Sequence, residues 1–267
     1  MWADNRTVTS SFQEVAENES KNLQVSVDSL GDTVSLIHDF ESVYDSLPPI
    51  MTLPAGGPES DEKMAVVAII HLMAFCRRQL TMGCLTLMRA QQGDSLLHLR
   101  RAIECCAFAV RIWKHNELAR VWLNAVDGGE AYKTFRKAFG PGKIFPKPED
   151  PDYERLLDEL YERYDRCSMK AHPNVYGMGG HFDYGDSTEK FSFSLNFFDL
   201  PPDHSLISGI YLMFDSHKRM LRLFGRMLER YAGDRMQKWR NDYGYVDAKL
   251  DVHREQWKMV VPDPGYK

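Results

Sequence analysis

The 267-residue sequence has few cysteines and no long uninterrupted hydrophobic segment. Its five cysteines, at positions 76, 84, 105, 106 and 167, include no C-x-x-C pair, which argues against a disulfide framework or a zinc ribbon. We therefore expect free, mostly buried thiols in the reducing cytoplasm. The longest apolar run, Met64–Cys76, has 13 residues, which is too short to span a bilayer. We expect this run to lie in a buried core helix, and we expect no membrane partner.

Several sequence signals are also missing. The N-terminal residues MWADNRTVTSS lack the basic segment and apolar stretch of a secretory signal. No Glu-x-x-His or His-Glu-x-x-His pattern occurs, and no glycine-rich loop follows a predicted strand. Asp165, Ser168 and His172 lie along one helix and have no G-x-S-x-G motif, unlike a hydrolase triad. The sequence therefore predicts neither a metal site nor a cofactor.

Charge is distributed unevenly along the chain. Residues 1–62 carry twelve acidic and two basic side chains, whereas the remaining 205 residues carry 31 basic and 26 acidic ones. The net charge of −5 thus conceals an acidic N-terminal region that precedes a mildly basic body, which slightly favours an anionic partner. With 43% hydrophobic residues, the chain can bury a sizeable core, and this excludes wholesale disorder.

Hydrophobic residues recur at three- and four-residue intervals and predict an all-α bundle of six or more helices. We expect an acidic N-terminal arm or tail (1–32), a single helical domain (33–259) and a C-terminal tail (260–267). The expected helices begin at Thr33 and at Ser60 (to Gln92), and then cover residues 94–115, 116–126, 130–139, 151–171, 203–231 and 234–257. The strict alternation of Phe and Leu with Ser and Asn at 191–197 predicts a small β-hairpin-like insertion around 181–198.

The helix that contains Met64–Cys76 is apolar on nearly every side. With the following helix, 94–115, it is therefore predicted to form the buried centre of the bundle. Val67, Ile70 and Phe75 should be buried there, unless a subunit interface covers them.

The end of the predicted helix 151–171 carries the polar residues of greatest interest. His172 precedes Pro173, which disfavours the helical conformation, so its ring should lie near the last carbonyl groups of the helix. One interpretation is a structural, helix-capping histidine. The other is a reactive histidine at the edge of the bundle, with Arg166 five intervening residues away.

Three segments carry a resemblance to known proteins. Arg101-Ala-Ile-Glu104 and the apolar run that follows it, within Leu97–Trp113, resemble a motif of a family of uncharacterised bacterial all-helical proteins. The segments 116–123 and 164–173 resemble further stretches of this family. Its members are similar to the HEPN superfamily of helical bundles. The resemblance covers roughly residues 61–173.

Many HEPN proteins are metal-independent endoribonucleases whose site is an arginine, four to six residues, and a histidine, usually assembled across a dimer. The resemblance therefore implies RNA as a partner, a homodimer, and a catalytic role for Arg166 and His172. A histidine can accept the ribose 2′-OH proton, and an arginine can stabilise the pentacoordinate phosphate. Cys167 departs from the family pattern, which commonly has a polar residue there. A regular helix also separates Arg166 from His172 by about 120°, so they converge only if the last turn unwinds or a partner subunit contributes.

Glu104 lies in an apolar sequence context, where an unpaired charge would be costly. We expect it to be buried and paired with an arginine, Arg101 being the nearest candidate, or else to orient Arg166 or His172. Ser168 completes this predicted supporting polar cluster.

Four arginines on the predicted helix 203–231 share a narrow arc and are candidates for phosphate binding, namely Arg219, Arg222, Arg226 and Arg230. Such an arc is more often the solvated face of an amphipathic helix. The leading functional hypothesis is a HEPN-like helical protein that acts on nucleic acid as a ribonuclease. The alternative is a non-catalytic helical binding or dimerisation module with a structural Glu-Arg-His cluster.

Overall fold

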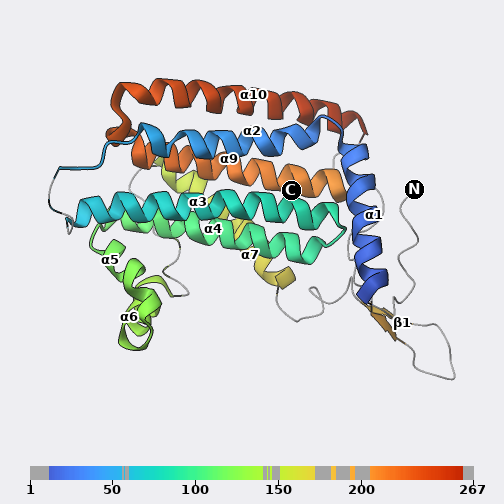
Figure 1. Cartoon of the computed structure of the whole chain (residues 1–267), viewed down its shortest axis with the longest axis horizontal. Helices are drawn as coiled ribbons and strands as arrows, with labels where there is room; N and C mark the ends of the chain where they lie inside the picture. Colours follow the sequence, from blue (N-terminus) through green and yellow to red (C-terminus); the bar gives the residue numbers. More distant parts are fainter. Residues whose placement is uncertain are drawn as a thin grey trace.

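The computed structural model describes residues 12–55, 57, 60–140, 143, 145, 151–171, 182–184, 193–195 and 205–260. Over these residues the chain forms the predicted all-α multi-helix bundle (Figure 1). The helices are α1 (Phe12–Leu30), α2 (Thr33–Ser46), α3 (Asp61–Met88), α4 (Gln92–Lys114), α5 (Leu118–Leu123), α6 (Gly129–Phe139), α7 (Pro151–Ala171), α9 (Ser205–Ala232) and α10 (Met236–Val260). Helices α2, α3, α4, α9 and α10 follow the long axis, α1 crosses one end, and α5 and α6 project at the other end (Figure 1).

Helix α3 lies at the centre of the bundle and packs against α4, α9, α2 and α5. It begins after Ser60, as predicted, with Asp61 and Glu62 in its first turn, where acidic side chains interact favourably with the helix dipole. Its inner side is fully buried from Ala65 to Leu87 and provides the middle of the core. The predicted central position of α3 is therefore confirmed.

The outer side of α3 corrects the prediction for Val67, Ile70 and Phe75. Val67 and Ile70 are half-buried, and Phe75 is 39% exposed. At 100° per residue these side chains lie on one side of the helix with Ala74 and the exposed His71 and Arg78, and we call this side the α3 outer face. The run was predicted to be buried all round, but neighbouring helices cover only part of its circumference.

The length of α3 also differs from what the apolar run suggested. The helix extends over 28 residues, and by length and composition alone it is able to cross a membrane. Half of its most apolar 18-residue stretch is nevertheless buried inside the bundle, as in the core helix of a soluble protein.

The acidic N-terminal region contributes a helix that docks on the bundle. Asn22 and Ser26 of α1 are buried against the end of α3, where Ser26 Oγ donates to the Met88 carbonyl at 2.7 Å. Asn22 Nδ2 donates to the Arg89 carbonyl at 3.4 Å. The last carbonyls of a helix have no partner within it, so α1 supplies side-chain donors to them. The low hydrophobic periodicity of residues 1–32 concealed this helix.

The projecting part of the fold begins where α4 ends. The predicted helix 116–126 is divided into α5 and a 3-10 turn, Asn124–Asp127. Gly128 and Gly129 then adopt positive φ values of 71° and 51°, a conformation that favours glycine, and α6 begins. Phe135 and Phe139 of α6 pack on Phe108 of α4 and attach this element to the bundle.

Helices α9 and α10 complete the bundle on the other side of α3. Phe40 of α2 stacks on Phe214 of α9 with ring centroids 5.2 Å apart. Trp239 of α10 lies against Gly225 of α9 and donates from Nε1 to the Val43 carbonyl at 3.1 Å. In addition to the helices, the strands β1 (Phe182–Tyr184) and β2 (Phe193–Leu195) pair antiparallel. The residues between them lie outside the described part of the chain.

Candidate functional site

Helix α7 carries the predicted catalytic arginine. Leu156, Leu157, Leu160 and Cys167 are buried and form the packed side of α7. Arg166 lies on the opposite side and is exposed. Among the described residues it has no hydrogen-bond or ion-pair partner, which leaves its guanidinium available for an anion. His172 follows the last residue of α7 and lies outside the described residues, together with the loop after it.

The predicted cluster of Glu104, Arg101 and Ser168 is not formed. Glu104 is half-buried rather than buried, and its partners are Arg100, at 3.5 Å, and Tyr164. Arg101 is exposed, and Ser168 donates to the carbonyl of Tyr164 in its own helix at 2.8 Å. Both arginines are spaced to reach Glu104, and Arg100 is the one that pairs with it while also donating to Tyr164 of α7.

Arg100, Glu104 and Tyr164 form a polar link between α4 and α7. The Tyr164 hydroxyl donates to Glu104 Oε1 at 3.0 Å, and Arg100 Nη2 donates to the Tyr164 oxygen at 3.2 Å. The guanidinium also lies over the Tyr164 ring, 5.1 Å from its centroid. Burial raises the pKa of Tyr164, so its hydroxyl remains a donor at neutral pH. This link lies one helical turn or less before Arg166 and fixes that part of α7.

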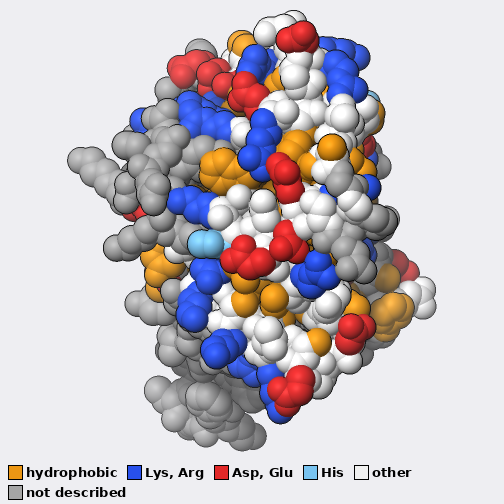
Figure 2. All heavy atoms as spheres, turned by 90° about the vertical axis from the view of Figure 1, so that its left-hand side faces the viewer, with side chains coloured by type: hydrophobic (Ala, Val, Ile, Leu, Met, Phe, Trp, Pro, Cys, Tyr) orange, Lys and Arg blue, Asp and Glu red, His pale blue; other side chains and the backbone are white. Residues whose placement is uncertain are grey.

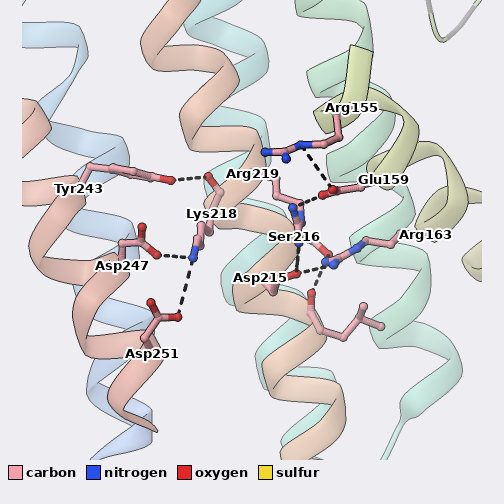
Figure 3. A network of polar contacts seen from close by, with 11 residues as sticks. Arg155, Glu159, Arg163, Asp215, Ser216, Lys218, Arg219, Tyr243, Asp247 and Asp251 are labelled. Carbon is pink, nitrogen blue, oxygen red and sulfur yellow. Dashed lines mark hydrogen bonds and ion pairs between the residues drawn. The ribbon is translucent and has the colours of Figure 1, made fainter. Parts of the chain in front are cut away.

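A second, more buried network joins α7 to α9 (Figure 3). Asp215 Oδ2 binds Arg163 of α7 and also accepts from Arg219 Nε at 3.2 Å. Arg163 Nη1 donates to the buried Ser216 hydroxyl at 2.7 Å. Arg219 reaches back to Glu159 of α7, which also lies 3.9 Å from Arg155 Nε. Charges of both signs therefore alternate across the contact between the two helices.

The electrostatics of this network depend on Asp215, whose side chain is only 9% exposed. Burial alone would raise the pKa of Asp215, but Arg163 and Arg219 hold it below its ordinary value. The carboxylate therefore stays charged at neutral pH, and both arginines are held in fixed positions. This arrangement stabilises the α7–α9 contact and leaves no free group there for acid–base chemistry.

The four phosphate-binding candidates of α9 do not form one continuous open surface. Arg219 belongs to the network with Asp215 and Glu159, and Arg230 pairs with Glu62 at 3.1 Å. Arg222 is exposed, and Arg226 is half-buried. Lys218 of the same helix binds Asp247 of α10 (Figure 3). Ion pairs within the bundle therefore occupy at least two of the four arginines.

His217 is a buried titratable residue that the sequence analysis did not single out. It is fully buried in α9, and its Nδ1 lies 2.9 Å from the Tyr44 hydroxyl of α2. Burial lowers the pKa of His217 to about 3, so the ring is neutral at physiological pH. Its Nε2 has no partner among the described residues. This histidine contributes to the packing of α2 on α9 and is shielded from any solvent-borne substrate.

The sequence contained a signal for the Asp215 network, and the analysis did not use it. Asp215 and Arg219 are four residues apart on one helix, as are Arg155 and Glu159, and such pairs face one another. The pairing of Arg163 with Asp215 joins residues 52 positions apart and has no local signature.

Within the described part of the chain, no group of three or more His, Cys, Asp or Glu side chains is arranged to hold a metal ion. The described site thus consists of one open cation, Arg166, on a helix that two polar networks hold against α4 and α9. Such a site can bind a phosphate group, and it needs a proton acceptor from the residues after α7 for chemistry. No protein-family model, curated protein or solved structure matches this chain.

Proposed function

We propose that the protein is a HEPN-like helical ribonuclease that cleaves RNA without a metal, using Arg166 and His172. The proposal rests on one observation, which is how the arginines on α7 differ in their pairing with acidic side chains. Arg155 and Arg163 are paired with acidic side chains, whereas Arg166 is exposed and has no partner among the described residues. A side chain that stabilises a phosphate in a transition state must be available in this way.

In the proposed reaction, His172 takes the proton of a ribose 2′-OH, and the 2′ oxygen attacks the adjacent phosphorus. A bond forms between the 2′ oxygen and phosphorus, and the bond from phosphorus to the 5′ oxygen of the next nucleotide breaks. Arg166 stabilises the additional negative charge on the phosphate. The departing 5′ oxygen takes up a proton, so the products are a 2′,3′-cyclic phosphate and a 5′-hydroxyl end.

The α4–α7 and α7–α9 networks have a positioning role in this proposal. A catalytic pair must be held within a fraction of an ångström of its productive arrangement, and rigid supporting contacts accomplish this. Tyr164 and Arg163 provide such contacts within the last three turns of α7, three and four residues before the buried Cys167. Burial raises the pKa of the Cys167 thiol to about 12, which keeps it protonated and unreactive.

We also propose that two copies associate through the α3 outer face. The observation that favours this is the exposure of Phe75, with Val67 and Ile70 half-buried beside it. Because Arg166 and His172 lie about 120° apart on a regular helix, a second copy would also explain how the pair is assembled. A dimer without cleavage activity would correspond to the non-catalytic binding module.

The experiment is incubation of the purified protein with total RNA in the presence of EDTA. The parent should degrade RNA, and His172→Ala and Arg166→Ala should abolish degradation. Arg101→Ala is the matched control, because it removes an exposed arginine of α4 that belongs to neither network, and it should retain activity. Cleavage that persists in His172→Ala, or an inactive parent, would refute the ribonuclease proposal.

A further inference from the structure

The projecting helix α6 carries three aromatic residues on one side. Tyr132, Phe135 and Phe139 are spaced by three and four residues, so their rings follow one another along the helix. The Tyr132 and Phe135 centroids are 6.1 Å apart with an interplanar angle of 25°. The Phe135 and Phe139 centroids are 5.2 Å apart at 27°. We call these three rings the ring stack.

The ring stack is anchored at one end and open at the other. Phe139 is 3% exposed and meets the Phe108 ring of α4 edge-on, with centroids 5.0 Å apart. Phe135 is half-buried, and Tyr132 is 50% exposed. One side of the Tyr132 ring faces Phe135, and its exposed surface is where a further planar group can continue the stack. The inner rings hold Tyr132 in place, so a ligand need not order it.

Cationic side chains accompany the ring stack. Arg136 of α6 is exposed about 40° around the helix from Tyr132, Lys133 and Lys137 are exposed further around it, and Lys143 is exposed just after the helix. Lys133 is paired with Glu130, the only acidic residue of α6. Arg136 and Lys137 have no partner among the described residues. Figure 2 views the end of the molecule from which α5 and α6 project, and Lys and Arg side chains follow one another over its lower part.

We propose that α6 is a binding site for single-stranded RNA, in which an unstacked base continues the ring stack on Tyr132 and an adjacent phosphate binds Arg136. Stacking of bases on aromatic side chains and contacts of phosphates with cations are the two components of single-strand recognition. Base stacking tolerates any sequence, because every base has a planar face. A planar face beside an unpaired cation therefore fits a nucleic-acid strand better than it fits an acidic peptide, which needs only the charge.

This inference rests on the proposed ribonuclease function, since α6 would bind the RNA strand that Arg166 and His172 would cleave. Helix α6 is attached to α4 through Phe108, and α4 also carries the Arg100–Glu104–Tyr164 link to α7. The strand-binding surface and the proposed cleavage pair are therefore connected through one helix of the bundle core. Binding through α6 does not itself require His172, so the two functions can be tested separately.

The test measures fluorescence anisotropy of a labelled 12-nucleotide oligoadenylate RNA with the full chain carrying His172→Ala, which prevents cleavage. Tyr132→Ala should weaken binding roughly tenfold through loss of base stacking, and Tyr132→Phe should bind like the parent. Arg136→Gln should weaken binding and reduce its dependence on salt. Lys238→Gln is the matched control, because Lys238 is exposed on α10 and its loss should leave binding unchanged.

Equal binding by Tyr132→Ala and the parent chain, at unchanged helix content, would overturn the inference. So would binding to vesicles of anionic phospholipid without binding to the oligoadenylate. A parent that binds through Tyr132 but leaves RNA intact would support the site on α6 and refute the ribonuclease proposal. A parent that cleaves through Arg166 and His172, but whose RNA binding is insensitive to Tyr132→Ala, would refute the site on α6 and support the ribonuclease proposal.

Discussion

Asp215 is the residue on which the contact between α7 and α9 most depends. Its carboxylate is held between Arg163 and Arg219, and all three side chains are largely removed from solvent. A buried ion pair adds little net stability over an apolar pair of the same shape. Removing one partner is different, because it leaves the opposite charge buried without compensation.

We predict that Asp215→Asn lowers the free energy of unfolding by about 3 kcal/mol, since two arginines lose the charge between them. Urea denaturation at pH 7 measures this change. Asp158→Asn is the matched control, because Asp158 is exposed on α7, and it should differ from the parent by less than about 0.5 kcal/mol. Equal stability of the two variants would contradict the role given to the network.

His217 makes the stability of the protein depend on pH in acid. Burial lowers the pKa of His217 to about 3, whereas an unfolded histidine titrates near 6.5. Between these values the unfolded state binds a proton that the folded state does not, so stability falls as the pH falls. We predict a contribution of about 1.4 kcal/mol per pH unit between pH 6 and pH 4.

The measurement is the free energy of unfolding in urea at several pH values for the parent and for His217→Gln. Glutamine can still hydrogen-bond Tyr44, but it does not titrate, so the variant should show the smaller dependence on pH. The two proteins should converge at low pH as the advantage of the parent is lost. Parallel pH curves would show that His217 is already protonated in the folded protein.

Among the elements, helix boundaries follow local chemistry and were predictable. The predicted helix starts at residues 60, 130 and 151 lie within one residue of the observed starts of α3, α6 and α7. A serine before the first turn of α3 and a proline at the start of α7 explain two of them. Helix α1 was missed because polar residues provide much of its contact with the bundle, through Asn22 and Ser26. Hydrophobic periodicity cannot detect a helix that docks through hydrogen bonds to another helix end.

The packing of α10 on α9 depends on the absence of a side chain at Gly225. A Cβ atom there would lie about 2.5 Å from the Trp239 ring, so Gly225→Ala should destabilise the protein by about 2 kcal/mol. Gly244→Ala is the matched comparison, because a Cβ at Gly244 of α10 meets nothing within 4 Å. Alanine favours a helix over glycine, so this variant should be more stable by about 0.5–1 kcal/mol.

Thermal melting of both glycine variants gives the comparison directly. The melting temperature should fall for Gly225→Ala and rise for Gly244→Ala. Changes of the same sign in the two variants would show that helix propensity, and not the close approach of Trp239, determines the outcome.

At the scale of the whole molecule, the sequence predicted the bundle and its central helix, but it could not predict which charged residues meet. Periodicity reports how each helix is oriented towards the core, and it contains no information on the partner across the contact. Arg101 was therefore assigned to Glu104 by proximity in sequence, whereas Arg100 is the residue that pairs with Glu104 in the structure. Arg219 was assigned to phosphate binding, although Asp215 and Glu159 hold it.

The proposed dimer predicts that a charge on the α3 outer face separates the two copies. Phe75→Glu should convert a dimeric parent into a monomer, because a carboxylate would be desolvated in the interface. Val252→Glu changes another exposed apolar side chain, on α10, and should remain dimeric. Sedimentation velocity at micromolar concentration distinguishes these outcomes. A monomeric parent would remove the basis for assembling Arg166 and His172 across two copies.

The most direct measurement of the central claim is the chemistry of the RNA ends. A defined single-stranded RNA is incubated in EDTA with the parent, Arg166→Ala or His172→Ala, and the products are identified by mass spectrometry. The account predicts 2′,3′-cyclic phosphate and 5′-hydroxyl ends with the parent and intact RNA with both variants, each still folded, with His172→Ala losing only about 1 kcal/mol of stability. Intact RNA with the parent, or the same products from a folded His172→Ala variant, would contradict it.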